Sequence, residues 1–395
     1  MNESLQKYTI GDDVKAQILE SLWEGCQPSF NEDDVRPNLD AYFEHYYRTR
    51  VQQFSREGGI HICINSHADV LEITSQILGD VTRDAISQFL PKKLQQPRDS
   101  GNEKSVDPKH HHNINTINST IDLCAGLLAM CEFSAPAFGI SGSHPLPWAA
   151  NLSLRQAISS HFFFSSPLGT SGTPETLGIP GGGKPKTKTL SPESPRIPRI
   201  FTAKSLLTIG DMKIRWTSNL IDHLLLSDDD QTVLIFPHVA FLRYHTSFAS
   251  GLFPEGLAEE TLRSLAILFP TVDMNTSSSS STKWLDVTGE GVGMGTELGI
   301  VIKELSKLGN PRAHDRRFER FEFWHDRLVI LKQAFDEAGP RGWTQWWKDR
   351  RNSVQWYTFW VAIWVFVTAV VFGIVQSVEG GLQVYLTWKG MMPEG

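Results

Sequence analysis

The chain has 395 residues, 40% of them apolar and 21% charged, and this length allows two or three domains of ordinary size. A mean hydropathy of -0.23 excludes a protein that crosses the membrane many times. The net charge of -7 excludes attachment to nucleic acid through overall positive charge, so we expect no nucleic-acid partner.

Residues 1–95 are predicted to form a mixed α/β unit. Aromatic residues recur at helical spacing within Asp34–Glu57 and predict an amphipathic helix there. The alternating sequence Ile60–Ile64 predicts a strand. Val70–Leu90 returns to helical spacing, and Pro91 is expected to end this helix.

The next hundred residues alternate between polar and apolar segments. Residues 96–118 are polar and predict a linker, whereas residues 119–164 are apolar and are expected to pack on the first unit. Residues 165–200 are rich in Ser, Pro, Gly, Thr and Lys, a composition that cannot bury enough apolar surface to form a core. We expect them to be a disordered linker.

Residues 201–271 are predicted to form a compact α+β module. Two short apolar runs, Lys204–Ile209 and Met212–Trp216, flank Gly210 and Asp211 and predict a hairpin. A helix, a strand and two further helices are expected in that order at Ser218–Leu226, Thr232–Phe236, Val239–Phe248 and Glu255–Leu268.

Residues 272–311 predict a flexible Ser/Gly connector, and residues 312–338 predict an amphipathic juxtamembrane helix. Six apolar residues spaced three and four apart form a stripe on this helix: Phe318, Phe321, Trp324, Leu328, Leu331 and Phe335. The stripe could pack on the 201–271 module, pair with a second chain as a short coiled coil, or lie on a membrane surface. Acidic residues between its arginines disfavour the membrane surface, and we expect packing on the module.

The segment 356–375 is predicted to be a transmembrane α-helix. Its twenty residues carry no charge and would span about 30 Å as a helix, the thickness of a bilayer core. Its eleven Val, Ile and Phe residues contribute about -3 to -7 kcal/mol to insertion. Aromatic residues typical of interfacial belts lie at or beyond the two ends, namely Trp343, Trp346, Trp347, Trp356, Tyr357, Tyr385 and Trp388. The expected fold class is an α+β soluble region with a C-terminal single transmembrane α-helix.

Positive charge near this segment predicts its orientation. Four basic residues precede the span and one follows it: Arg341, Lys348, Arg350, Arg351 and Lys389. The positive-inside rule then places the N-terminal region in the cytosol. The short tail, residues 376–395, would make the protein tail-anchored. Because this tail is not basic, an endomembrane or the plasma membrane is a better expectation than the mitochondrial outer membrane.

Two adjoining stretches, Trp346–Arg351 (WWKDRR) and Gln355–Ala362 (QWYTFWVA), resemble the C-terminal anchor of a large family of uncharacterised proteins from filamentous fungi. The flanking sequences Phe323–Leu328 and Gln376–Gly380 match it as well. The resemblance covers residues 312–388 and, more weakly, 201–271. It implies single-pass membrane topology and no particular reaction.

No residue is predicted to be catalytic, to bind a cofactor or to hold a metal. The Gly289–Gly295 stretch lacks the spacing and the lysine of a phosphate-binding loop, and Gly139–Gly142 lacks the last glycine of a nucleophile elbow. Weak metal-site candidates are His110–His112, His61 with Cys63 and His67, and Asp228–Asp230. Glycosylation sequons begin at Asn118, Asn151 and Asn275, and in a cytosolic domain they would stay unmodified.

Three functions are compatible with these features. The leading hypothesis is a membrane-anchored cytosolic interaction protein, an adaptor or scaffold, which contacts the lipid bilayer through residues 356–375 and binds protein partners. The alternatives are an oligomeric channel or transporter subunit, and an anchored enzyme whose site converges from distant segments. No cofactor is expected for any of the three.

Overall fold

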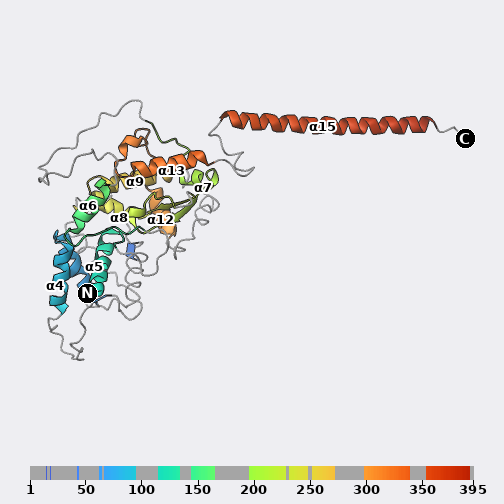
Figure 1. Ribbon diagram of the computed structural model, residues 1–395. Coiled ribbons are helices and arrows are strands. Elements are labelled where there is room, and N and C mark those ends of the chain that lie inside the picture. Colours follow the sequence, from blue (N-terminus) through green and yellow to red (C-terminus); the bar gives the residue numbers. More distant parts are fainter. Residues whose placement is uncertain are drawn as a thin grey trace. The chain divides into compact units, whose positions relative to one another are not determined.

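The computed structural model describes residues 62–64, 66–94, 114–133, 144–164, 195–227, 231–247, 251–271, 298–338 and 353–391, together with Lys15, Ile18, Tyr42 and Phe43 (Figure 1). The chain divides into two compact units. The first contains residues 1–207 and 212–337 and is called the core unit below. The second contains residues 208–211 and 338–395, which include the long C-terminal helix.

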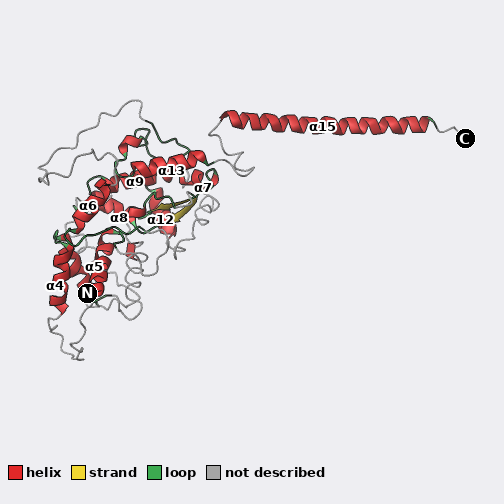
Figure 2. Cartoon of the chain, viewed as in Figure 1, coloured by secondary structure: helices red, strands yellow, loops and turns green. Residues whose placement is uncertain are grey.

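Helices dominate the described residues, and strands are few (Figure 2). The core unit contains the helices α3 (His67–Leu78), α4 (Arg83–Leu94), α5 (Ile114–Ala129), α6 (Leu154–Phe164), α7 (Ala203–Thr208), α8 (Val239–Ser247), α9 (Leu257–Leu268), α12 (Leu298–Ser306) and α13 (His325–Glu337). The α+β expectation for this part therefore holds only weakly, since the sheet has two short strands. The predicted helix at 34–57 lies outside the described residues except for Tyr42 and Phe43, both of which are buried.

The N-terminal helical prediction was wrong in its bounds. The expected helix 70–90 is two helices, α3 and α4, because Asp80 adopts a left-handed conformation (φ 60°) directly after Gly79. A capping box formed by Ser66 and Asp69 begins α3. Pro91 does not end α4 but lies within it, near its last turn. Residues 62–64 form no strand in the structure.

Helix α5 is the most buried helix of the N-terminal part, with eleven buried residues from Ile117 to Ala129. It begins at Ile114, so the predicted linker 96–118 ends earlier than expected. The hydroxyl of Tyr42 donates a hydrogen bond of 2.6 Å to the Leu127 carbonyl, which attaches the N-terminal segment to this helix. Helix α5, which contains the start of the apolar segment 119–164, packs against α3 and α4.

The predicted hairpin at residues 204–216 was wrong. Its first half is the helix α7, and its second half is strand β1 (Lys213–Trp216), which pairs in parallel with β2 (Thr232–Ile235). In this pairing Lys213 lies opposite Thr232, and Trp216 lies opposite Ile235. The expected helix 218–226 is reduced to a single 3₁₀ turn, Leu220–Asp222. Beyond it, Leu224 donates to the Leu234 carbonyl, so β2 is hydrogen-bonded on both sides.

Two segments predicted to be linkers contribute to the core unit where they are described. Helix α12 lies within the expected connector 272–311, and its Val301 and Leu305 are buried. Residues 195–200, at the end of the expected disordered linker, pair with the chain before α13. The Ile197 amide donates to the Arg316 carbonyl at 2.8 Å, and Ile197 is buried.

The apolar stripe of residues 312–338 packs on the 201–271 module, as predicted. All six stripe residues are buried, the Phe335 ring meets Phe201 with centroids 5.7 Å apart, and Trp324 meets His223 at 5.1 Å. The helix itself is shorter than predicted. Residues 312–324 form turns with a 3₁₀ turn at Phe318–Arg320, and α13 begins only at His325.

Helix α15 (Ser353–Gly390) is the main element of the second unit and has 38 residues. Within it, Trp356–Gly390 is long and apolar enough to cross a membrane, and it is the one such helix among the described residues. This finding is compatible with a single-pass membrane protein. The helix exceeds the predicted span 356–375, because it continues through residues expected to be a short tail. At 1.5 Å per residue its 38 residues measure about 57 Å, more than a bilayer core requires.

Candidate functional site

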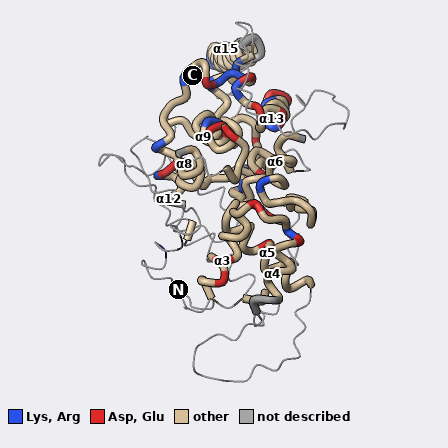
Figure 3. Tube along the Cα trace, turned by 90° about the vertical axis from the view of Figure 1, so that its left-hand side faces the viewer, with Lys and Arg blue, Asp and Glu red and all other residues tan. Residues whose placement is uncertain are grey.

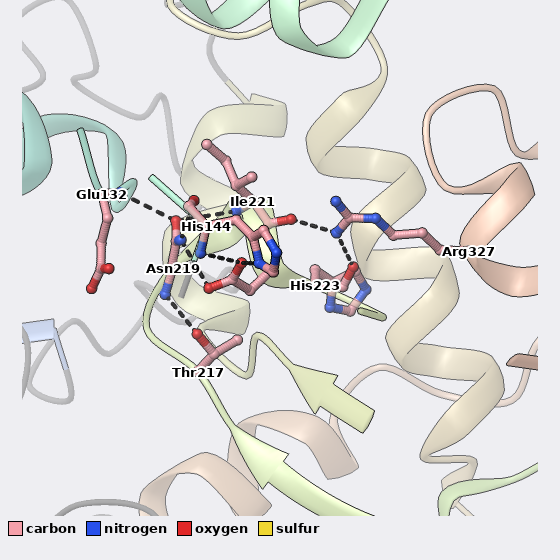
Figure 4. Close-up of polar contacts among 8 residues, drawn as sticks. Glu132, His144, Thr217, Asn219, Ile221, His223 and Arg327 are labelled. Atoms are coloured by element: carbon pink, nitrogen blue, oxygen red, sulfur yellow. Dashed lines mark hydrogen bonds and ion pairs between the residues drawn. The ribbon is translucent and has the colours of Figure 1, made fainter. Parts of the chain in front are cut away.

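A polar cluster with a buried centre joins three parts of the core unit, and we call it the polar junction. It consists of His144, Asn219, Asp222, His223 and Arg327 (Figure 4). Asn219 and Asp222 come from the turn after β1, His144 precedes α6, and Arg327 projects from α13. The junction therefore connects the α5–α6 region, the 201–271 module and α13.

Asn219 makes hydrogen bonds in three directions from a nearly fully buried position. Its side-chain oxygen accepts from the backbone amides of Glu132 (3.2 Å) and Ile221 (3.3 Å), and its amide nitrogen donates to the Asp222 carboxylate (2.9 Å). The same nitrogen donates to the His144 carbonyl at 3.3 Å. A short polar side chain at this position thus satisfies backbone groups on both sides of the interface.

Asp222 is a buried carboxylate, 2% exposed, behind an exposed imidazole. Its Oδ1 accepts the His144 backbone amide at 3.2 Å and lies 3.5 Å from His144 Nδ1, while the His144 side chain is 64% exposed. Burial raises the pKa of Asp222, against the lowering effects of Asn219 and His144. The pair resembles the acid–imidazole half of a general-base site. The hydrogen bonds and ion pairs described for it include no nucleophile.

His223 is fully buried and uses both ring nitrogens. Its Nδ1 accepts the Phe236 amide at 3.2 Å, so Nε2 carries the proton and donates to Ser264 Oγ at 2.7 Å. Ser264 in turn donates to the Thr261 carbonyl. Burial, and second the charge of Arg327, lower the pKa of His223 to about 3. His223 cannot take a proton from Ser264, because its acceptor nitrogen is already occupied.

Arg327 connects α13 to the 3₁₀ turn. Its guanidinium donates to the carbonyls of Ile221 and His223, the latter at 2.7 Å, and stacks on the Trp324 ring at 5.2 Å. Burial lowers the pKa of Arg327, and the nearby Asp222 charge opposes this effect. Both hydrogen bonds are donated by Nη1, and they hold α13 against the 3₁₀ turn.

Glu260, on α9, holds the chain just before α13. Its carboxylate accepts three backbone amides, those of Glu322 (2.8 Å), Phe323 (2.9 Å) and Trp324 (2.7 Å). The Trp324 indole also donates to Thr261 Oγ1 at 2.8 Å. Burial raises the pKa of Glu260 to about 7, although the three amide donors lower it.

Replacing Glu260 with glutamine is expected to destabilise the core unit by about 2–3 kcal/mol. The side-chain NH₂ group of glutamine is a donor, so it cannot accept the backbone N–H groups that now bind the carboxylate. At least one of these three N–H groups would then lack an acceptor in a buried site. The control is Glu259→Gln on the same helix, whose side chain is 69% exposed and whose loss should cost under about 0.5 kcal/mol. Urea unfolding of the detergent-solubilised chain, followed by tryptophan fluorescence, measures both. Equal midpoints for the two variants would contradict the prediction.

A pH-dependent effect is expected from His245, on α8. It is buried between Phe241 and Phe253, with ring centroids 4.5 and 4.9 Å away, and burial lowers its pKa to about 3. An unfolded histidine titrates near 6.5, so below that pH the unfolded chain binds the extra proton and the free energy of unfolding falls. Between pH 5.5 and 4.5, where the unfolded histidine is almost fully protonated, this histidine alone makes that fall steeper by about 1.4 kcal/mol per pH unit.

The comparison with His245→Gln isolates this contribution from every other titrating group. The variant should lose stability on acidification less steeply than the native chain, by that same amount per pH unit. Urea midpoints at pH 6.5, 5.5 and 4.5 give the two slopes. Parallel slopes would show that His245 is protonated equally well in the folded chain.

The metal-site candidates from the sequence do not come together where they are described. Cys63 is buried and its thiol lies 3.2 Å from the Thr120 hydroxyl, and His67 is buried in the first turn of α3. No group of three or more His, Cys, Asp or Glu residues that could hold a metal ion occurs in the described part of the chain. His61, His110–His112, Ser141, Asp228–Asp230 and Gly289–Gly295 lie outside the described residues.

Sequence reasoning missed the polar junction and Glu260. One local signal was present: an asparagine three residues before an aspartate is typical of the start of a short helical turn. In the structure Asn219 is the N-cap of the 3₁₀ turn, and its side chain accepts the Ile221 amide. Comparison with known proteins adds no assignment: no protein-family model, no curated protein and no solved structure matches this chain.

Proposed function

We propose that this protein is a membrane-anchored cytosolic interaction protein, an adaptor or scaffold whose core unit is held at an endomembrane or the plasma membrane. The observation that carries the proposal is the exposure of α15. Its large apolar side chains remain uncovered, among them Trp364 (67% exposed) and Phe366 (69% exposed). A helix that is apolar all round requires an apolar surrounding, and a lipid bilayer supplies one.

The cytosolic orientation rests on charge. Four basic residues lie within the fifteen positions before the uncharged segment 356–375, and Lys389 is the one basic residue after it. Cytoplasmic flanks of single spans carry such an excess of Lys and Arg. The resemblance of residues 312–388 to anchors of filamentous-fungal proteins agrees with a C-terminal anchor.

An interaction role rather than a catalytic one is supported by the polar junction. Its groups bind backbone amides and carbonyls of other segments and thereby hold together the 201–271 module, α13 and the residues Glu132 and His144, which lie between α5 and α6. A rigid body on a membrane anchor is suited to presenting a surface to partners. Both nitrogens of His223 and the guanidinium of Arg327 are committed to this structural task.

The topology is tested by expressing the chain with sealed microsomes. If the core unit is cytosolic, external protease degrades it and the sequon at Asn151, an exposed residue, stays unglycosylated. A glycosidase-sensitive mass shift, or protection of the core unit from protease, would place it in the lumen and overturn the orientation.

The interaction role is tested by recovering the chain from detergent extracts of its native membrane and identifying co-purifying proteins. The matched control is the Val365→Arg/Val367→Arg variant, which is expected not to reach the membrane. We expect at least one protein to be enriched with the native chain over the control. Recovery of no protein above the control would count against an adaptor.

A further inference from the structure

Two distant segments of the core unit that pair with each other carry six arginines, and we call these residues the arginine cluster. Residues 195–200 contribute two and residues 311–320 contribute four: Arg196, Arg199, Arg312, Arg316, Arg317 and Arg320. The same segments contain two carboxylates, Asp315 and Glu319. This concentration of positive charge occurs in a chain whose net charge is -7.

Backbone pairing brings the arginines together. Arg196 and Arg317 lie opposite each other in an antiparallel bridge. The Ile197 amide donates to the Arg316 carbonyl (2.8 Å) and the Phe318 amide to the Pro195 carbonyl (3.4 Å), which makes Arg196 and Arg317 a non-hydrogen-bonded pair. Side chains are closest in this kind of pair, and like charges placed opposite each other are destabilising.

Arg316 adds a second unfavourable charge. It is only 9% exposed, its Nη2 donates to the Pro198 carbonyl (3.0 Å), and its buried Nε has no hydrogen-bond partner in the described residues. Burial, and second the charge of Arg199, lower the pKa of Arg316. A desolvated guanidinium beside another cation is costly unless an anion compensates it.

The carboxylates in the described part of the chain do not provide that anion. Asp315 is engaged with the His314 ring (3.0 Å) and the Arg312 backbone amide (3.0 Å). Across the described residues, no carboxylate forms an ion pair with Arg196, Arg199 or Arg316. Among the described residues these guanidinium groups therefore lack an acidic partner, which leaves them available to an anion from outside the chain.

We propose that the arginine cluster is a binding site for a phosphate group, carried either by a lipid headgroup or by a free phosphate compound. Guanidinium groups bind phosphate oxygens through paired N–H donors, and a phosphate monoester supplies the charge that neighbouring arginines require. Arg196, Arg199, Arg312 and Arg320 are exposed and accessible to such a ligand. Figure 3 colours the Lys and Arg positions of the described chain blue. Headgroup phosphates are an available source, because Arg320 precedes the start of α15 by 33 residues.

The test is a binding titration with the full-length chain in neutral detergent, which does not depend on the orientation of the anchor. The ligands are inorganic phosphate, soluble inositol trisphosphate, dioctanoyl phosphatidylinositol bisphosphate and, as a zwitterionic control, dioctanoyl phosphatidylcholine. We expect the phosphate-rich ligands to bind and the control lipid not to bind. If the phosphatidylinositol bisphosphate binds and inositol trisphosphate does not, the ligand is a lipid headgroup. If inositol trisphosphate binds with the same affinity as the lipid, the ligand is a soluble phosphate compound.

The variant Arg196→Gln/Arg199→Gln removes two exposed charges and should weaken binding about 30-fold, roughly fivefold for each arginine. The matched control, Lys213→Gln/Lys303→Gln, removes two exposed charges elsewhere and should change the affinity less than twofold. Unchanged proteolysis of both variants establishes that they fold. Equal affinities for native chain and arginine variant, binding of none of the phosphates, or tighter binding of an oligonucleotide than of every phosphate monoester would overturn the proposal.

Discussion

Replacing Leu328 with aspartate is expected to destabilise the core unit by about 5 kcal/mol. Leu328 is 0% exposed on the face of α13 that packs on the 201–271 module. Loss of the buried leucine side chain alone costs about 2–5 kcal/mol, and an unpaired carboxylate in its place adds a desolvation penalty. Since domains of this kind are stable by roughly 5–15 kcal/mol, this single change should detach α13 or unfold the unit. Phe321→Asp, at another fully buried stripe position, should act in the same way.

The exposed face of the same helix provides the control. Ile330 is 53% exposed, and Ile330→Asp introduces the same charge two residues away. It should change stability by less than about 0.5 kcal/mol. Limited proteolysis of the full chain in detergent measures the difference, with new cleavage between residues 195 and 338 expected for the two stripe variants alone. If the stripe variants show the cleavage pattern of the native chain, α13 is not held by its apolar stripe.

The second large effect is expected in α15. Val365 and Val367 lie at the middle of the uncharged segment 356–375, and each is exposed on the helix. An arginine at the centre of a span costs about 2.5–3.5 kcal/mol for insertion, and the lost valine adds a few tenths. Two such changes, Val365→Arg/Val367→Arg, cost about 6 kcal/mol in total, which cancels most or all of the favourable insertion energy of the segment.

We expect this double variant to leave the membrane fraction. Resistance to alkaline carbonate extraction after synthesis with microsomes measures insertion directly. The control Val365→Leu/Val367→Leu keeps the segment apolar and should stay in the membrane fraction. Continued insertion of the arginine variant would show that a different part of Trp356–Gly390 crosses the bilayer, because that apolar helix is longer than the bilayer core requires.

Long periodic segments could be predicted from the sequence, while short ones could not. The helices α8 and α9 and the strand β2 lie where their local patterns place them. The run Lys204–Ile209 was predicted to be a strand, but the buried pair of α7, Ala203 and Leu206, is three residues apart, a spacing typical of a helix and not of a strand. The partner of β1 is β2, which pairs with it in parallel. Parallel strands are not joined by a tight turn, so the sequence between them contains no turn signal that would predict the pairing.

The long apolar helix α15 and the burial of the stripe in residues 312–338 follow from local sequence alone, because lack of charge and helical spacing of apolar residues are properties of one segment. The polar junction, the Glu260 contacts and the arginine cluster depend on residues far apart in the chain: Asn219 meets Glu132 across 87 residues, Arg327 meets His223 across 104, and Arg316 meets Pro198 across 118. A buried polar group binds whichever backbone the fold brings within about 3 Å. The packing of distant segments therefore decides which partner the group binds. The local sequence around either residue does not predict this partner.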